Sequence, residues 1–436
     1  MSKYTFKLSN YHAIEDAEII LDGITVLSGE NGSGKSTISR WLYYLVRGTN
    51  EYETFVEKEA MAEIRLLLDN IRRASMILDY DRIIRSTQTR QVLNEIWSNG
   101  IDAYQDKFNS IVDSFMDTLY KELSSRKSIS IPIRRLSTIF QIELPKSNDV
   151  ESTLDVIGNK LRDDYQEIVL RTIEQRKRRD VSSLSKIIRN ISSPGDGWPN
   201  VISLQEDNSP LVNRKDFREP AMLNKAIYYG TQRTINSLEY DTELDRLLRN
   251  ESYETPKQLD VIRMRIQRII NGTITYEDES SLLMEEPGLY YYRKVDNLRI
   301  PLKQAATGIT SFAYLLQLLN NGHLQKDTLL IIDEPEAHLH PQWIVEYAKL
   351  LVLLNEKIGM KILVSSHNPD MVSALQSISR KEGVLDSVHF YVAQKQIEGT
   401  RYSFKHLGTE IGEIFESFNI ALSRIKMYGE NGLEEE

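Results

Sequence analysis

The sequence predicts an α/β fold with a largely parallel sheet, divided by a helical insertion. A glycine-rich loop near the N-terminus joins a short apolar strand to a helix. The last third of the chain alternates apolar strands with helices, a pattern typical of a parallel sheet. Between these parts, residues 51–216 show mostly helical spacing. We therefore expect one α/β domain in two pieces, residues 1–50 and 217–436, with a helical insertion between them.

Composition excludes several classes of function. The chain has 436 residues, a formal net charge of −9 and no cysteine. The acidic balance argues against a surface coated in basic residues for general nucleic-acid binding, although it is compatible with a local basic groove. The absence of cysteine excludes disulfides, cysteine zinc sites and thiol catalysis. No signal-peptide core and no apolar run of membrane-spanning length stands out, so we expect a cytoplasmic protein with no membrane partner.

The N-terminal piece is expected to form three strands, a loop and a helix. The strands are predicted at YTFKLSN, AEIILDG and ITVLS, and the last of them runs straight into the loop GENGSGKST. After the loop, apolar residues recur at helical spacing from Ile38 as far as Gly48. This order suits a bound triphosphate, because backbone N–H groups and the helix N-terminus face the anion. A plain turn between strand and helix is the alternative, and this context disfavours it.

The loop fits the phosphate-binding pattern G-x-x-x-x-G-K-[ST], with Gly29, Gly34, Lys35 and Ser36 at the diagnostic positions. Lys35 is expected to reach the β- and γ-phosphates of ATP, and the hydroxyl of Ser36 to ligate Mg2+. The predicted cofactors are therefore ATP and Mg2+. The loop residues expected to contact the nucleotide are Gly29, Asn31, Gly32, Ser33, Gly34, Lys35, Ser36 and Thr37.

The insertion is predicted from long helical segments. Helical spacing is clear in EAMAEIRLLLDNIRRASMIL and YQDKFNSIVDSFMDTLYKEL, whereas SSPGDGWPN is typical of a loop. A basic cluster, RTIEQRKRRD at residues 171–180, falls on a predicted helix. Such clusters are more often solvated helix faces than nucleic-acid sites, so contact with nucleic acid stays the minority interpretation.

The C-terminal piece supplies the remaining strands of the predicted sheet. A strand is expected at KAIYYGTQ, residues 225–232, then a helix at PKQLDVIRMRIQRIING and a further strand at GLYYYRKV. Strands are then expected at TLLIID, MKILVSS and VHFYVA, alternating with helices at PQWIVEYAKLLVLLNEK and MVSALQSI. Strands that alternate with helices in this way favour a parallel sheet.

Polar residues end two of these strands. Leu329–Ile332 predict a buried strand that ends at Asp333 and Glu334. Asp333 is well placed to bind Mg2+ through water, and Glu334 to orient or deprotonate the attacking water. Two exposed acids at a strand end are the alternative, which the lysine loop in the same chain disfavours. His367 follows the next strand and is a candidate for sensing the γ-phosphate, an ordinary polar residue being the alternative.

In these residues the chain resembles an ABC-type ATPase head of the SMC, RecF and OLD group. Gly29–Ser36 match Walker A. Leu329–Asp333 match Walker B, followed by Glu334 as the catalytic glutamate, and His367 matches the switch histidine. PEAHLHP resembles the D-loop of the OLD-like branch. The resemblance covers both ends of the chain and hardly the middle, and it implies a P-loop NTPase fold of ABC-ATPase type.

At the signature segment the chain departs from the family. The family carries a serine–glycine–glycine motif ahead of a helix, whereas this chain has QAATGITSFAYLLQLL. Thr307 and Gly308 stand in the corresponding positions, and Ile309 stands where a second glycine is frequent. A hydroxyl and a glycine at a helix N-terminus can still contact a phosphate, so Thr307 and Gly308 join the candidates for nucleotide contact. In the family two heads enclose two ATP molecules, which implies a homodimer or higher homo-oligomer here.

Two details of the resemblance concern metal binding. His338 and His340 of the D-loop segment could suggest a metal pair, but no third ligand is near them in the sequence, and the D-loop interpretation is favoured. The family also has a magnesium-sensing glutamine. Four residues are candidates for it, and the choice among them stays open: Gln88, Gln91, Gln141 and Gln232.

Stand-alone heads of this kind resemble ATPase subunits of bacterial anti-phage defence systems such as Septu and PARIS. The resemblance implies an ATP-hydrolysing switch that acts as sensor or scaffold for a separately encoded effector protein. A DNA-repair ATPase similar to RecF, acting directly on DNA, is the alternative. A binding scaffold without hydrolysis is disfavoured by Lys35, Asp333 and Glu334. Neither a long coiled-coil arm nor a Toprim nuclease domain is expected, because sustained heptads are absent and residues 368–436 are too few for that domain.

Overall fold

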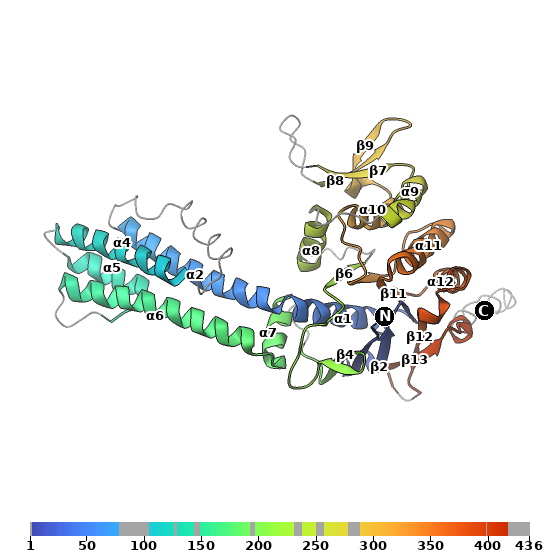
Figure 1. Cartoon of the computed structure of the whole chain (residues 1–436), viewed down its shortest axis with the longest axis horizontal. Helices are drawn as coiled ribbons and strands as arrows, with labels where there is room; N and C mark the ends of the chain where they lie inside the picture. The colour runs from blue at the N-terminus through green and yellow to red at the C-terminus, as the bar shows by residue number, and fades with distance from the viewer. Residues whose placement is uncertain are drawn as a thin grey trace, which may run out of the picture. The chain divides into compact units, whose positions relative to one another are not determined.

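The chain divides into two compact units by its internal contacts. Unit 1 comprises Met1–Asn50 and Asp180–Glu436, and unit 2 comprises Glu51–Arg179. Each unit is described by itself. The structure is a computed structural model, and it describes residues 2–77, 104–125, 129–143, 149–191, 197–230, 238–249, 257–277, 288–397 and 399–416 (Figure 1).

A parallel core lies at the centre of the main sheet of unit 1. Its strands follow the order β12-β3-β11-β10-β6, and every neighbouring pair among them is parallel. All residues of β3, β10 and β11 are buried, as expected for strands covered by helices on both faces. These strands are β3 (Ile24–Ser28), β6 (Lys225–Gly230), β10 (Thr328–Asp333), β11 (Lys361–Ser366) and β12 (Val388–Lys395).

The remaining strands of this sheet flank the parallel core on the β12 side. Within the described residues the sheet has ten strands, in the order β5-β4-β1-β2-β13-β12-β3-β11-β10-β6. The pairs β5–β4, β4–β1, β1–β2 and β13–β12 are antiparallel, whereas β2–β13 is parallel. The flanking strands are β1 (Tyr4–Tyr11), β2 (Ile14–Leu21), β4 (Val201–Glu206), β5 (Ser209–Val212) and β13 (Tyr402–Gly408). The expected α/β fold with a largely parallel sheet is confirmed at the core.

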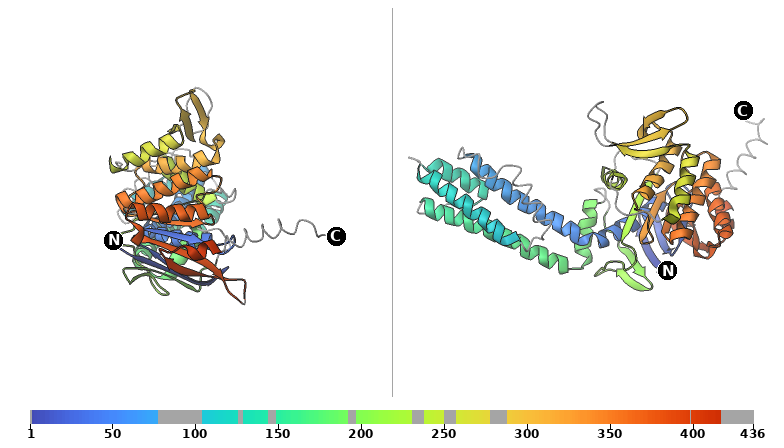
Figure 2. Two further views of the ribbon diagram at one scale, coloured as in Figure 1. Left: turned by 90° about the vertical axis from the view of Figure 1, so that its right-hand side faces the viewer. Right: turned by 45° about the horizontal axis from the view of Figure 1, so that its top comes forward.

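Helices cover both faces of the parallel core. Alternate residues of β3, β10 and β11 pack into one apolar cluster with α10 (Thr307–Asn320), α11 (Pro341–Ile358) and α12 (Pro369–Lys381), which Figure 2 shows stacked beside the sheet. On the other face, α1 (Lys35–Asn50) contacts β6, β10 and β11. Adjacent residues of one strand point to opposite faces, so Tyr228 of β6 packs on Tyr43 of α1, whereas Tyr229 points toward α11.

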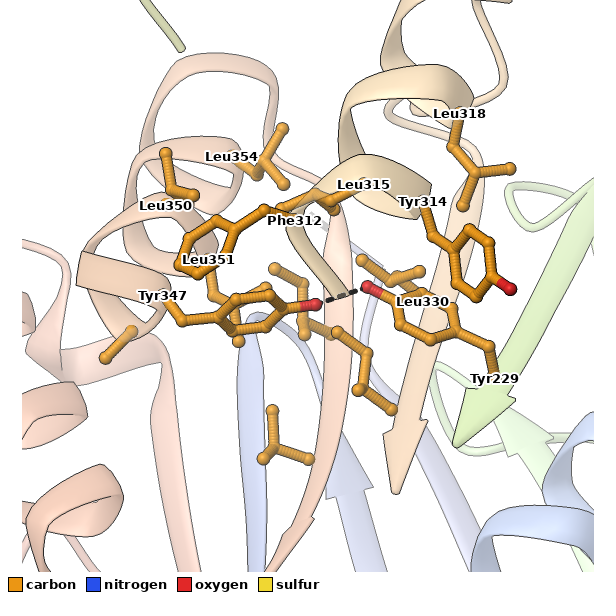
Figure 3. Close-up of a cluster of buried hydrophobic side chains, with 14 of the residues drawn as sticks. Tyr229, Phe312, Tyr314, Leu315, Leu318, Leu330, Tyr347, Leu350, Leu351 and Leu354 are labelled. Carbon is orange, nitrogen blue, oxygen red and sulfur yellow. Dashed lines mark hydrogen bonds between the residues drawn. The ribbon is translucent and has the colours of Figure 1, made fainter. Parts of the chain in front are cut away.

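The cluster under α10 and α11 contains a buried pair of tyrosines (Figure 3). The hydroxyls of Tyr229 and Tyr347 hydrogen-bond to each other, and both side chains are almost fully buried. Each hydroxyl satisfies the other, which avoids the cost of burying an unpaired polar group in an apolar core. The leucines and aromatics labelled around them are Phe312, Tyr314, Leu315, Leu318, Leu330, Leu350, Leu351 and Leu354.

Smaller elements complete unit 1. A second sheet in the described residues has three strands, β7 (Thr273–Glu277), β8 (Gly288–Arg293) and β9 (Leu298–Pro301), all antiparallel. The other helices described are α7 (Val181–Ile191), α8 (Leu238–Arg249) and α9 (Asp260–Ile269). No helix in the described part of the chain is both long and apolar enough to span a membrane.

Unit 2 is helical, with its own apolar core. Its described helices are α2 (Tyr52–Ile77), α4 (Gln105–Ser124), α5 (Ser130–Phe140) and α6 (Val150–Lys177). Phe108 of α4 stacks on Tyr165 of α6 with ring centroids 4.2 Å apart. The basic cluster at residues 171–180 pairs with acids of α2: Arg171 with Glu63, Arg176 with Glu57 and Arg179 with Glu53. Three arginines of the cluster are therefore already neutralised inside unit 2, which disfavours their use for nucleic acid.

The insertion ends earlier than the sequence predicts. We expected it to continue to Asp216, but the contacts place its end at Arg179. The physical reason is that the following segment joins the sheet and packs on α1. β4 pairs with β1 along six residues, and α7 contacts α1.

Candidate nucleotide-binding site

The predicted phosphate loop connects β3 to α1. Gly29, Gly32 and Gly34 all have positive φ, of 153°, 81° and 97°. A Cβ on Gly34 would lie 2.6 Å from the side chain of Ile14, so this position excludes any larger residue. α1 begins at Lys35 and has no acidic residue in its first turn, so its N-terminal N–H groups stay available to an anion.

Lys35 folds over the loop that precedes it. Its Nζ donates to the backbone oxygens of Gly29 and Glu30, at 2.8 Å each, and its side chain is almost fully buried. Burial lowers the pKa of Lys35, and the negative charges of Glu334, Asp333 and then Glu336 oppose this lowering. The structure thus brings Lys35 within electrostatic reach of the carboxylates at the end of β10, nearly 300 residues away in sequence.

Asp333 ends β10 with a buried carboxylate. Its Oδ2 accepts a hydrogen bond from the hydroxyl of Tyr228 at 2.6 Å. Its Oδ1 is buried and has no hydrogen-bond partner among the described residues. A buried carboxylate oxygen without a partner is costly, and a hard cation prefers such a ligand. The residues present therefore fit Mg2+, with Ser36 in the first turn of α1 as the second expected ligand.

Glu334 and His367 lie next to each other. Glu334 has a φ of 50°, rare outside glycine, and its N–H donates to the backbone oxygen of Ser365 at 2.8 Å. Oε1 of Glu334 lies 3.4 Å from Nδ1 of His367. Glu334, the candidate for activating the attacking water, and His367, the candidate for sensing the γ-phosphate, are thus in contact.

Glu336 is a site residue that the sequence analysis missed. It is buried, and its Oε1 accepts from the hydroxyl of Ser366 at 2.7 Å and from the backbone N–H of His367 at 3.1 Å. The same oxygen lies 3.6 Å from His367 Nδ1. Burial raises the pKa of Glu336, and the two hydrogen bonds act in the opposite direction. Glu336 therefore ties the loop after β10 to the end of β11 and holds Glu334 close to His367.

The two histidines of the D-loop segment have no metal cluster around them. In the described residues no group of three His, Cys, Asp or Glu side chains could hold a metal ion. His340 is instead the N-cap of α11, with Nδ1 accepting from the backbone N–H of Gln342 at 3.4 Å. His338 lies in the loop before it, with a φ of 63°. The D-loop interpretation of this segment stays a prediction.

The signature segment forms the start of α10, and its two candidate residues differ. Thr307 is exposed in the first turn. Gly308 is buried against α11, where a Cβ would lie 2.9 Å from the ring of Trp343. Glycine at 308 is therefore required by packing on Trp343, which the sequence analysis did not foresee. Of the two side chains, only that of Thr307 is exposed for contact with a ligand.

Comparison with known proteins identifies the family. The family described as AAA ATPase domain matches residues 4–372. The chain belongs to this ATPase family. It is also 35% identical to the Old nuclease of Escherichia phage P2 over 68 residues, which are 16% of this chain and 11% of that protein.

Two solved structures of SMC heads match this chain at low sequence identity. One is the Smc head domain with an extended coiled coil bound to the C-terminal domain of ScpA, from Pyrococcus furiosus. The two chains are 10% identical, and the match covers 98% of this chain and 100% of the Pyrococcus furiosus chain, with a TM-score of 0.35. The second is the SMC head domain from Thermotoga maritima, which is also 10% identical. This match covers 93% of this chain and 98% of the Thermotoga maritima chain, with a TM-score of 0.35.

The identity of the magnesium-sensing glutamine stays open among the four candidates. Gln88, Gln91 and Gln232 lie outside the described residues. Gln141 follows α5 in unit 2. β6 ends at Gly230, which pairs in register with Asp333. In the sequence, Gln232 follows Gly230 by two positions.

The loop geometry predicts that Lys35→Ala weakens ATP binding by about a hundredfold, because a charge-assisted hydrogen bond in a buried site is worth up to about 3 kcal/mol. Nucleotide titration of a folded variant measures this, with circular dichroism as the check on folding. Lys357→Ala, at the exposed C-terminal end of α11, is the matched control and should bind like wild type. Wild-type affinity in Lys35→Ala would contradict the assignment of the loop.

Proposed function

We propose that this chain hydrolyses ATP with Mg2+ and uses the cycle as a molecular switch. The observation that supports it best is the convergence of Lys35, Asp333 and the Glu334–His367 pair at the carboxyl edge of β3, β10 and β11. In open α/β sheets, ligands bind outside the carboxyl ends of the strands.

In the proposed mechanism, the N–H groups of the loop and Lys35 bind the β- and γ-phosphates. Ser36 and Asp333 would hold Mg2+, which would supply positive charge next to the phosphates. Glu334 orients the attacking water and accepts its proton. His367, whose Nδ1 faces the carboxylates of Glu334 and Glu336, has Nε2 left for the γ-phosphate. Glu336 keeps that histidine in place.

Glu334→Gln separates binding from chemistry. Because an amide cannot accept the proton, we expect turnover to fall at least about a hundredfold while ATP stays bound. If heads close on ATP, this variant should also accumulate as a nucleotide-bound dimer or higher assembly. Turnover and mass are measured side by side, with Glu410→Gln on an exposed loop as the control. A fully active Glu334→Gln enzyme would rule out Glu334 as the catalytic base.

We further propose that two copies enclose the nucleotides and that Thr307 of one copy completes the site of the other. The exposed side chain of Thr307 at the start of α10 supports this proposal, since a helix N-terminus carries a partial positive charge. Gly308→Asp is unsuitable as a test, because any side chain at 308 meets Trp343. Thr307→Asp places the repelling charge on an exposed position instead.

In the test, two variants that carry different affinity tags are mixed, and the mixed dimers are purified through both tags. Thr307→Asp protomers with Lys35→Ala protomers should recover hydrolysis, because one composite site stays intact. The control combines wild type with a protomer that carries both changes, and its mixed dimers should be inactive. If each site used its own Thr307, the results would be reversed: the first mixture would be inactive and the control active.

For the biological role, we propose a cytoplasmic sensor or scaffold ATPase of an anti-phage defence system that controls a separately encoded effector. Two features of unit 2 support a protein partner. Three arginines of its basic cluster are paired with acids. Large apolar side chains are exposed on it, with Leu66 61%, Ile131 63% and Leu170 60% exposed. A RecF- or SMC-like ATPase that acts directly on DNA is the alternative and agrees equally well with the family.

Co-expression with the neighbouring gene product distinguishes these roles. We expect the chain alone neither to cut DNA nor to slow growth, and to co-purify with the neighbouring protein in a way that Glu334→Gln changes. Nuclease activity, growth and co-purification are the measurements. ATPase activity stimulated by DNA, without a retained protein, would favour the repair role. Strong DNA cleavage by the chain alone that Glu334→Gln leaves unchanged would contradict both.

A further inference from the structure

A tyrosine of the neighbouring strand holds the carboxylate of Asp333. Tyr228 lies on β6, which runs parallel to β10, and its hydroxyl donates to Asp333 Oδ2 at 2.6 Å. On its other side, the guanidinium of Arg40 in α1 hydrogen-bonds to the same hydroxyl. The ring of Tyr228 also packs against Tyr43, with centroids 5.8 Å apart. The phenol is thus fixed between β6, β10 and α1.

This arrangement makes the two oxygens of Asp333 different. Oδ2 is occupied by a neutral donor, while Oδ1 is buried without a hydrogen-bond partner among the described residues. The phenol of Tyr228 has a single proton, which it donates to Oδ2. A carboxylate with one oxygen tied down cannot rotate, and its other oxygen has a fixed direction.

We propose that Tyr228, supported by Arg40, is a positioning residue that fixes Asp333 so that Oδ1 receives the Mg2+ of the bound nucleotide. This inference rests on the proposed ATP site. Arg40 bonds to the hydroxyl of Tyr228, which in turn donates to the carboxylate of Asp333. Arg40 therefore supports Asp333 without a direct ion pair between the two. A direct arginine–carboxylate pair would neutralise the charge that a cation needs, whereas a phenol orients the ligand and preserves that charge. Hydrogen bonds in series also polarise each other, which strengthens the hold on Oδ2.

β6 itself provides a matched control. Tyr228 and Tyr229 are neighbours, and Phe at either position removes one phenol hydroxyl from the same strand. Tyr228 bonds to Asp333, whereas Tyr229 points to the opposite face and bonds to Tyr347 in the core. Any general effect of losing a phenol hydroxyl from this strand should appear in both variants, and an effect on the metal only in Tyr228→Phe.

The experiment titrates wild type, Tyr228→Phe and Tyr229→Phe with ATP, once with Mg2+ and once with EDTA. In EDTA, we expect Tyr228→Phe to bind ATP as wild type does. With Mg2+, we expect the gain in affinity to be about tenfold smaller than in wild type, since loss of a group that orients a ligand costs 10- to 100-fold in metal affinity. Tyr229→Phe should keep the full gain, although its melting temperature should fall.

The outcomes separate the inference from the proposed function. If wild type binds no ATP under either condition, the proposed function fails and the inference fails with it. If wild type gains affinity with Mg2+ and Tyr228→Phe gains as much, the inference alone is wrong. Equal losses for Tyr228→Phe in Mg2+ and EDTA would also overturn it, because they indicate a structural effect. Should Tyr228→Phe not fold, Arg40→Gln replaces it. We expect Mg2+ to raise the ATP affinity of Arg40→Gln less than that of wild type, though the deficit should be smaller than for Tyr228→Phe. A gain equal to that of wild type would contradict the inference.

Discussion

The site depends on the parallel register of β3, β11 and β10. Ser28 pairs with Ser366, and Ser365 pairs with Asp333, so all three strands end at one edge of the sheet. These strands are buried throughout, which confines them to the centre of a sheet covered on both faces. A slip of one residue would turn Asp333 toward the face of α11 and move Ser366 away from Glu336. The phosphate loop, the acidic end of β10 and His367 meet only because this register holds.

Charge is the second constraint at this edge. Asp333, Glu334 and Glu336 lie close to Lys35, and carboxylates that share a poorly solvated site repel one another. Their environments differ in a way that separates their roles. Asp333 receives a hydrogen bond from a phenol, and burial raises the pKa of Glu336, which favours its protonated form and reduces the repulsion. Glu334 stays partly exposed beside His367, where water can reach it. One acid is thus suited to a cation, one to a structural link and one to proton transfer.

The sequence predicted what depends on neighbours in the chain. The phosphate loop and the ends of β10 and β11 follow from a local motif and from uninterrupted apolar runs. It missed what depends on distant pairing. Tyr228 contacts a residue 105 positions away, and a tyrosine in a strand is ordinarily a core residue. For the same reason β4 was assigned to the insertion, since its partner β1 lies about 200 positions earlier. The packing of Gly308 on Trp343 is visible only in three dimensions, and the phosphate contact of Gly308 stays a prediction.

The way in which unit 2 is closed explains how an insertion can interrupt this sheet without disturbing its register. Within unit 2, the hydroxyl of Tyr52 donates to the backbone oxygens of Gln175 and Arg178, at 3.1 and 3.0 Å, and Glu53 pairs with Arg179. The first and last residues of the unit are therefore fastened to each other. Within unit 1, α7 packs on α1, so the two chain ends that flank the insertion are adjacent there as well. A segment that leaves and returns at one place can change in length or surface while the strands stay paired. The proposed ATP chemistry and the proposed partner recognition can consequently reside in two compact units of one chain, and only unit 1 has to keep the geometry of the proposed nucleotide site.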